Sequence, residues 1–432
     1  TGAEIFGIHI NDYTSDEQLS FLANSGALWS RFDRFHWDLI EPIPQTPPIH
    51  DWSSVDEIGL LKGAGLGVET IGMILFAPTY AQKYPGSICG PIAEEQLERF
   101  GNFLFALVDR YSKAPYHVKY WEIGNEPDVD YAFANRSGFG CWGNPEDPYY
   151  GGGYYAQMLK IAYPKIKAAD PQAQVLLGGL LLDCDPRNPP ETSAGSGDAK
   201  DCSPSLFLDG ILLNGGGDYF NGISFHAYDY YSFIEGKYSN FNWHSSSDTN
   251  GPVSIPKARF LQERLDHYGV SGKYLLNTES GLICGRTDKD PGCQTEEFFR
   301  TKAAYVVHSN TIALQLGLRI NIWYSMLGWR SSELVSSSYQ PLPAYDAYQF
   351  NARLLADAVF VREVQDYPNM FISEFQKPEG VLWVVWSRSG EFESIHLPSI
   401  PARVFDIYGN DLTPSQVISA NYSPIYLVMP TQ

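Results

Sequence analysis

Strand-like and helix-like segments alternate eight times within the first 360 residues, and this alternation restricts the possible folds more than any other feature. The strand-like stretches, rich in β-branched and aromatic residues, are 4–10, 27–32, 67–76, 118–126, 174–182, 222–228, 273–279 and 319–326. The intervening segments carry apolar residues at helical spacing, such as Leu97, Phe100 and Leu104. Eight such units predict a closed (β/α)8 TIM barrel; an open doubly wound sheet is the competing fold.

The links between these segments are unequal in length. Links from a helix to the next strand are short, whereas those after the third to seventh strands are long, as in 128–152 and 229–254. In a barrel, such long links lie at the carboxyl ends of the strands, where active sites are built.

Within the second helical segment, Val55, Ile58 and Leu61 recur at helical spacing, which predicts a helix from about Ser53.

The pattern changes after residue 360. Short β-type runs occupy 370–375, 381–387, 394–397, 403–408 and 424–429, and Gly- or Pro-containing turns separate them. We therefore predict two domains, a catalytic barrel over 1–360 and a small antiparallel β domain, sandwich-like, over 361–432. The second domain contains no cluster of chemically reactive residues, so a packing role is expected for it.

Charge and hydropathy exclude several classes of protein. The chain of 432 residues has a formal net charge of −20, which disfavours nucleic acid and anionic membranes as partners. No apolar run is long enough to span a bilayer. The sequence starts at Thr1 without a methionine, and we expect that a signal peptide has been removed.

Six cysteines lie in segments predicted to be loops. No two form a Cys-x-x-Cys pair, which disfavours a zinc or redox site. Disulfides in an exported protein explain them better, so we expect an extracellular or periplasmic location. Sequence does not determine the pairing, but proximity along the chain favours Cys184–Cys202 and Cys284–Cys293, leaving Cys89–Cys141.

Two glutamates end two of the predicted strands. The fourth strand ends at Glu126 in the run Trp121-Glu122-Ile123-Gly124-Asn125-Glu126-Pro127, and the seventh ends at Glu279. If both strands belong to one barrel, their carboxylates converge on one site. Paired carboxylates at rigid strand ends are what acid/base and nucleophilic chemistry at a sugar carbon requires.

The run from Trp121 to Pro127 resembles the acid/base motif of clan A glycoside hydrolases. The resemblance extends to His226 and Tyr228 on the sixth strand, Arg31 on the second and Trp323 on the eighth, and it is greatest to family 39 and its relatives. It implies a (β/α)8 barrel with the acid/base on strand four, here Glu126, and the nucleophile on strand seven, here Glu279. It also implies retention of configuration without a metal or cofactor.

Further residues are candidates for binding the sugar. The resemblance implies that Asn125 contacts the sugar 2-hydroxyl and that His226 lines the sugar subsite. Arg31 and Tyr228 are expected to hydrogen-bond the Glu279 carboxylate, although a purely structural Arg31–Glu279 ion pair is compatible with this. Trp323 is a candidate floor beneath the reacting ring, with barrel packing as the alternative role.

Two more candidates follow the second strand. His36 and Trp37 are expected to touch substrate, since they come directly after the strand that carries Arg31. Other barrel chemistries fit less well, because paired histidine ligands, a phosphate-binding loop and a Gly-x-Ser-x-Gly elbow are all missing from the sequence.

The sequence thus predicts a retaining glycosidase acting on a neutral poly- or oligosaccharide through a glycosyl-enzyme intermediate. A transglycosylase would use the same residues and differ only in whether a sugar, rather than water, intercepts the intermediate. A non-catalytic carbohydrate-binding barrel is the other alternative, but it would typically lack one of the two glutamates, and both are present.

Overall fold

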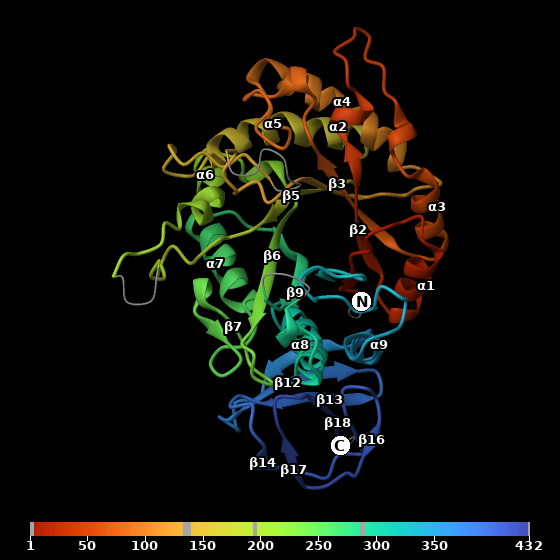
Figure 1. Ribbon diagram of the computed structural model, residues 1–432, viewed down its shortest axis with the longest axis vertical. Coiled ribbons are helices and arrows are strands. Elements are labelled where there is room, and N and C mark those ends of the chain that lie inside the picture. The colour runs from red at the N-terminus through yellow and green to blue at the C-terminus, as the bar shows by residue number, and fades with distance from the viewer. Residues whose placement is uncertain (1–3, 133–139, 193–196, 286–289, 431–432) are drawn as a thin grey trace.

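A closed barrel of eight parallel strands forms the core of the computed structural model, which describes residues 4–132, 140–192, 197–285 and 290–430. The strands follow the order β5-β4-β3-β2-β1-β10-β9-β6, and β6 pairs with β5 to close the circle (Figure 1). They are β1 (Phe6–Ile8), β2 (Trp29–His36), β3 (Glu69–Leu75), β4 (Tyr120–Asn125), β5 (Gln174–Leu180), β6 (Gly222–Tyr231), β9 (Tyr274–Ile283) and β10 (Asn321–Trp323). The predicted TIM barrel is confirmed.

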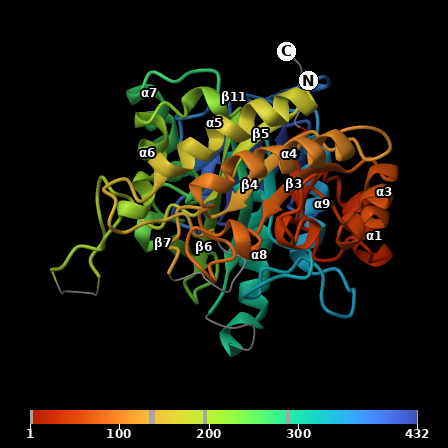
Figure 2. The same ribbon diagram turned by 90° about the horizontal axis from the view of Figure 1, so that it is seen from above.

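Helices between the strands surround the barrel (Figure 2). They are α1 (Asp16–Ser25), α2 (Trp37–Ile40), α3 (Glu57–Gly65), α4 (Leu97–Tyr111), α5 (Gly152–Ala169), α6 (Phe207–Leu213), α7 (Ser254–His267), α8 (Glu296–Gln315) and α9 (Pro343–Leu355). Side-chain caps fix where three of them begin: Ser15 accepts the N–H of Gln18 in α1, Asp56 that of Gly59 in α3, and Thr295 that of Phe298 in α8.

Helix α3 differs from its prediction. It begins at Glu57 rather than near Ser53. The apolar spacing was misleading, because Ile58 is 67% exposed. The helix instead packs through Gly59, where an added Cβ would lie 2.6 Å from the Cβ of Tyr13. Close approach through a glycine leaves no periodic apolar signal in the sequence.

The strand β6 also extends further than predicted. It runs on to Tyr231 and pairs antiparallel with β7 (Tyr238–Asn240), which pairs with β8 (Ser245–Ser246). Part of the long link after the sixth strand is therefore a β-sheet extension.

The C-terminal region forms antiparallel sheets that lie next to α8 and α9 (Figure 1). The larger sheet contains β11 (Val359–Glu363), β12 (Met370–Lys377), β13 (Gly380–Ser387), β18 (Ile425–Val428), β15 (Arg403–Phe405) and β16 (Asp411–Leu412), and the smaller contains β14 (Glu393–His396) and β17 (Val417–Ala420). The larger sheet thus includes residues on both sides of position 360. Its Trp386 stacks on His308 of α8 with ring centroids 4.6 Å apart, within one apolar core shared with the barrel.

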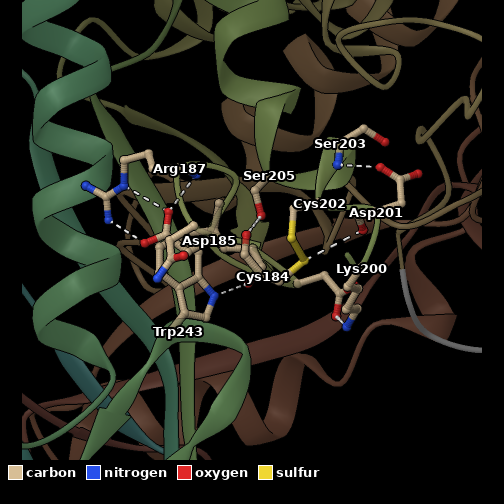
Figure 3. Close-up of a disulfide and its surroundings, with 12 residues drawn as sticks. Cys184, Asp185, Arg187, Lys200, Asp201, Cys202, Ser203, Ser205 and Trp243 are labelled. Atoms are coloured by element: carbon tan, nitrogen blue, oxygen red, sulfur yellow. Dashed lines mark hydrogen bonds and ion pairs between the residues drawn. A yellow bond between two sulfur atoms is a disulfide. The ribbon is translucent and has the colours of Figure 1, made fainter. Parts of the chain in front are cut away.

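Three disulfides tie the loops that follow barrel strands. They are Cys89–Cys141, Cys184–Cys202 and Cys284–Cys293, the pairs that proximity along the chain favours. Figure 3 shows the second, where the hydroxyl of Ser205 donates to the carbonyl of Cys184 (2.6 Å). Within the described ranges, no helix combines the length and the apolar character that crossing a bilayer requires.

Candidate active site

A buried arginine organises the carboxyl ends of the strands. Arg31 of β2, only 1% exposed, donates to Oε1 of Glu279 on β9 (2.5 Å). It also donates to Oε1 of Glu122 (2.7 Å) and Oδ1 of Asn125 (3.0 Å), both on β4. Burial opposes charging of Arg31, but the two carboxylates outweigh it and raise its pKa. One permanent cation therefore joins strands β2, β4 and β9.

Glu279 is held in its ionised form. Oε1 accepts from Arg31, and Oε2 accepts from the Tyr228 hydroxyl (2.5 Å). Burial alone would raise the pKa of Glu279, but His226, Arg31 and Tyr228 together lower it below the usual value. Burial lowers the pKa of His226 itself to about 3, so at neutral pH Arg31 and Tyr228 are the groups that bind the ionised Glu279 carboxylate.

Glu126 has the opposite environment. It directly follows β4 with a φ of 48°, is 4% exposed, and its Oε1 shares a hydrogen bond with Nδ1 of His226 (2.8 Å). Its Oε2 has no hydrogen-bond partner among the described residues. Burial, reinforced by the nearby negative charge of Glu279, raises the pKa of Glu126 to about 8. This carboxyl group is therefore protonated at neutral pH.

A glycine on β5 makes room for the histidine that contacts Glu126. An added Cβ at Gly179 would lie 2.1 Å from Nε2 of His226. The N–H of Gly179 also donates to Oε1 of Glu122 (2.8 Å). The double glycine Gly178-Gly179, unusual inside a strand, thus allows the imidazole to lie against the backbone.

The two carboxyl groups are close together. One oxygen of Glu126, one of Glu279 and a ring nitrogen of His226 all lie within 4.8 Å of one another. Retaining glycosidases place their carboxyl groups about 5–5.5 Å apart, whereas inverting enzymes leave about 6.5–9.5 Å for a water molecule. The pair therefore combines the spacing of the retaining class with pKa values shifted in opposite directions.

A cavity of about 330 Å³ opens onto both carboxyl groups. Its walls are aliphatic, aromatic and amide side chains, and its lining residues are Asn125, Glu126, Leu181, Tyr228, Tyr230, Glu279, Ile283, Tyr324 and Trp329. None of these is a lysine or arginine. A site with neutral, largely aromatic walls around two carboxyl groups suits an uncharged sugar ring.

Some predicted site residues lie elsewhere. Trp323 does not line the cavity; it is 1% exposed and its indole N–H donates to the carbonyl of Ser332 (2.8 Å). Its ring lies 6.1 Å from Tyr305 of α8, so it faces the helical layer. The next residue, Tyr324, lines the cavity instead, because the pairing of β9 and β10 shifts register between Asn321 and Trp323.

His36 and Trp37 also lie outside the cavity that contains the two carboxyl groups. Nε2–H of His36 donates to the carbonyl of Asp33 (2.8 Å). Trp37 is buried and donates to Oε2 of Glu41 (3.1 Å). Both side chains thus bind neighbouring residues around the end of β2. Arg31 and Tyr228 hydrogen-bond Glu279 as expected, and Asn125 lines the cavity. His226 was expected to line the sugar subsite, but it is fully buried behind the carboxyl pair and does not line the cavity.

Sequence reasoning missed Glu122 and Tyr324. Glu122 is fully buried and shares Arg31 with Glu279. The available signal was a carboxylate at the centre of an otherwise apolar predicted strand. A charged residue within a buried strand indicates a charged partner.

The carboxyl pair and His226 are also the one group of potential metal-ligating side chains within the described residues. A divalent cation there would face the guanidinium of Arg31, which is 2.5 Å from Glu279, and would compete with the hydrogen bonds of Tyr228 and His226. The donor set is therefore better suited to proton transfer than to metal binding.

Comparison with known proteins supports the fold. No protein-family model and no curated protein sequence matches the chain. Several solved structures of glycoside hydrolases are similar to this chain. A family 39 glycoside hydrolase from Bacteroides cellulosilyticus matches with a TM-score of 0.69 at 18% identity, covering 99% of this chain and 81% of that one.

Two further enzymes share the architecture. A family 30 endoxylanase from Clostridium papyrosolvens has a TM-score of 0.60 and an α-L-arabinofuranosidase from Thermotoga maritima one of 0.55, each at 12% identity over 99% of this chain and 96% of the other. The fold expected from the resemblance to family 39 is confirmed. At these identities the similarity establishes the architecture, and the function must be argued from the site.

Proposed function

We propose that this protein is a retaining glycoside hydrolase of clan A, with Glu279 as nucleophile and Glu126 as general acid/base. The observation that carries the proposal is the pair of carboxyl groups within 4.8 Å of each other, one with its pKa raised to about 8 and the other with its pKa lowered. Environments that separate two pKa values in this way assign the acid and the nucleophile.

The first step needs a proton and an anion at the same time. Glu126 is protonated near pH 7 and lines the cavity, where it can protonate the leaving oxygen, while Glu279 attacks the anomeric carbon from the opposite face. Arg31 and Tyr228 orient the attacking carboxylate and stabilise it again when it leaves.

The second step reverses the role of Glu126. Once Glu279 is esterified, its negative charge is gone, so one cause of the high pKa of Glu126 disappears. Glu126 then ionises more readily and takes a proton from the water that attacks the glycosyl-enzyme. The same electrostatic coupling therefore favours an acid in the first step and a base in the second.

Two other residues complete the proposed sugar site. Because Oδ1 of Asn125 accepts from Arg31, the orientation of the amide is fixed, and we assign the amide to the sugar 2-hydroxyl. Nδ1 of His226 hydrogen-bonds Glu126 and lies 3.5 Å from Oε2 of Glu279. We therefore assign His226 to positioning the two carboxyl groups rather than to contacting the sugar.

The substrate class follows from the cavity. Its lining has no cation that could pair with a uronate, so we propose a neutral oligo- or polysaccharide. The three disulfides support an exported protein that meets its substrate outside the cytoplasm.

A panel of aryl glycosides and neutral polysaccharides, with products followed by NMR and mass spectrometry, tests the proposal. Wild type should release a product of retained configuration, and both Glu126→Gln and Glu279→Gln should be nearly inactive. With azide, Glu126→Ala should form a glycosyl azide of retained configuration and Glu279→Ala one of inverted configuration. A first product of inverted configuration from wild type would refute the assignment.

A further inference from the structure

A half-exposed tryptophan stands at the rim of the catalytic cavity. Trp329, in the loop after β10, is 44% exposed and lines the cavity. Its ring meets the edge of Tyr228, which holds Glu279, at a centroid distance of 5.8 Å and an interplanar angle of 72°.

Buried side chains hold the loop that carries Trp329 from below. Lys302 of α8, fully buried, donates to the carbonyls of Ser331 (2.8 Å) and Glu333 (2.7 Å). Between them, the carbonyl of Ser332 accepts from the indole of Trp323. Three consecutive carbonyls are thus bound from the protein interior, so Trp323 supports this loop rather than touching the sugar.

The same loop is held from the side. The guanidinium of Arg330 donates to the carbonyl of Gly285 and lies 5.4 Å from the Trp329 ring and 5.6 Å from the Tyr230 ring. Arg330 and Ser331 both have positive φ, 50° and 63°. Non-glycine residues keep this conformation only where their surroundings enforce it, most often at ligand sites. Trp329 is therefore pre-organised before any ligand arrives.

We propose that Trp329, with Tyr230 also lining the cavity, is the stacking platform for the sugar next to the reacting ring. This inference rests on the proposed glycosidase function. Exposure increases from the carboxyl groups, 4% for Glu126 and 8% for Glu279, to the rim, 42% for Tyr230 and 44% for Trp329. A chain whose reacting ring lies at the carboxyl groups leaves past this rim, where the aromatic rings offer flat faces to it.

The test compares substrates with and without a sugar next to the reacting ring. Wild type and Trp329→Ala are assayed on the glycosyl fluoride and on the oligosaccharide of the sugar that the panel identifies. The variant should lose about tenfold in kcat/KM on the oligosaccharide, mainly through KM, and keep its rate on the fluoride, which has no neighbouring ring. Trp329→Phe should recover most of the loss. Phe392→Ala, which removes a 74% exposed aromatic of the C-terminal domain, is the control and should change neither rate.

The outcomes separate the platform from the underlying function. Equal losses on both substrates would place Trp329 at the reacting ring, and no loss on either would remove it from the substrate path; each overturns the proposal. Failure of wild type to cleave anything would count against the glycosidase function itself. In that case, the binding role of Trp329 is tested by fluorescence titration of Glu279→Gln with xylo-, cello-, manno- and arabino-oligosaccharides. Binding that weakens when Trp329 is also replaced supports Trp329 as the stacking platform. Binding that is absent, or that the replacement leaves unchanged, overturns it.

Discussion

The buried acid Glu126 should make the protein less stable at neutral pH than a glutamine at the same position would. Its pKa is about 8 in the folded chain, against 4.5 for an ordinary glutamic acid. The folded state therefore binds this proton more tightly than the unfolded state does. Its contribution to stability is complete below pH 4.5 and is lost as pH rises towards 8.

The size of the effect follows from the two pKa values. Each pH unit between them costs about 1.4 kcal/mol, so the ionisable group destabilises the fold by about 3 kcal/mol at pH 7 and by about 5 kcal/mol above pH 8. Glu126→Gln removes this cost, and the amide can still hydrogen-bond His226. The gain should be near zero at pH 4.5 and should grow with pH.

Urea unfolding followed by tryptophan fluorescence, at pH values from 4.5 to 8.5, measures this difference. Glu279→Gln is the matched control of opposite sign. The lowered pKa of Glu279 adds stability above its ordinary pKa, and that stability is lost as pH falls. Its replacement should therefore destabilise the protein most at neutral pH. A Glu126→Gln gain that does not depend on pH, or a loss at pH 8, would refute the electrostatic reasoning.

Three further changes test other contacts of the site. Tyr228→Phe removes a charged hydrogen bond to Glu279 worth about 1.5–3 kcal/mol, so the acidic limb of the kcat/KM–pH profile should move up by about 1–2 units, and an unmoved limb would contradict this. Gly179→Ala would place a Cβ 2.1 Å from His226, so kcat should fall about 100-fold while the circular dichroism spectrum is kept; near-normal turnover would show that the ring can move aside. Lys302→Met leaves two buried carbonyls without their donor and should lower the free energy of unfolding by about 3 kcal/mol in urea, with a smaller loss indicating that water replaces the amine.

The parts of the structure predicted correctly are those with a local signal. Alternating patterns fix the strands, and the chain order of the strands then brings Glu126 and Glu279 to one face of the barrel. The cysteine pairs at short separation, Cys184–Cys202 and Cys284–Cys293, were accessible for the same reason.

The errors arise where the outcome depends on a neighbouring strand or helix. Whether Trp323 or Tyr324 faces the cavity depends on a register shift against β9, which the sequence of β10 does not encode alone. Helix α3 packs through Gly59 against Tyr13, which is distant in the sequence, and its apolar Ile58 therefore faces solvent. His36 and Trp37 lie at the end of β2, the strand that carries Arg31, but hydrogen bonds to Asp33 and Glu41, which are close in the sequence, keep them away from the cavity.

The cluster around Arg31 has a consequence for how the chain is made. Its two carboxylate partners are 91 and 248 residues further along the sequence. At about 5–20 residues per second, the ribosome adds Glu279 many seconds after Arg31 has emerged. Until then, the guanidinium lacks one of the charges that compensate its burial. The barrel therefore closes, and the charge of Arg31 is fully compensated, only late in synthesis. A nascent chain that stops before β9 has neither a complete barrel nor Glu279, the nucleophile that we propose.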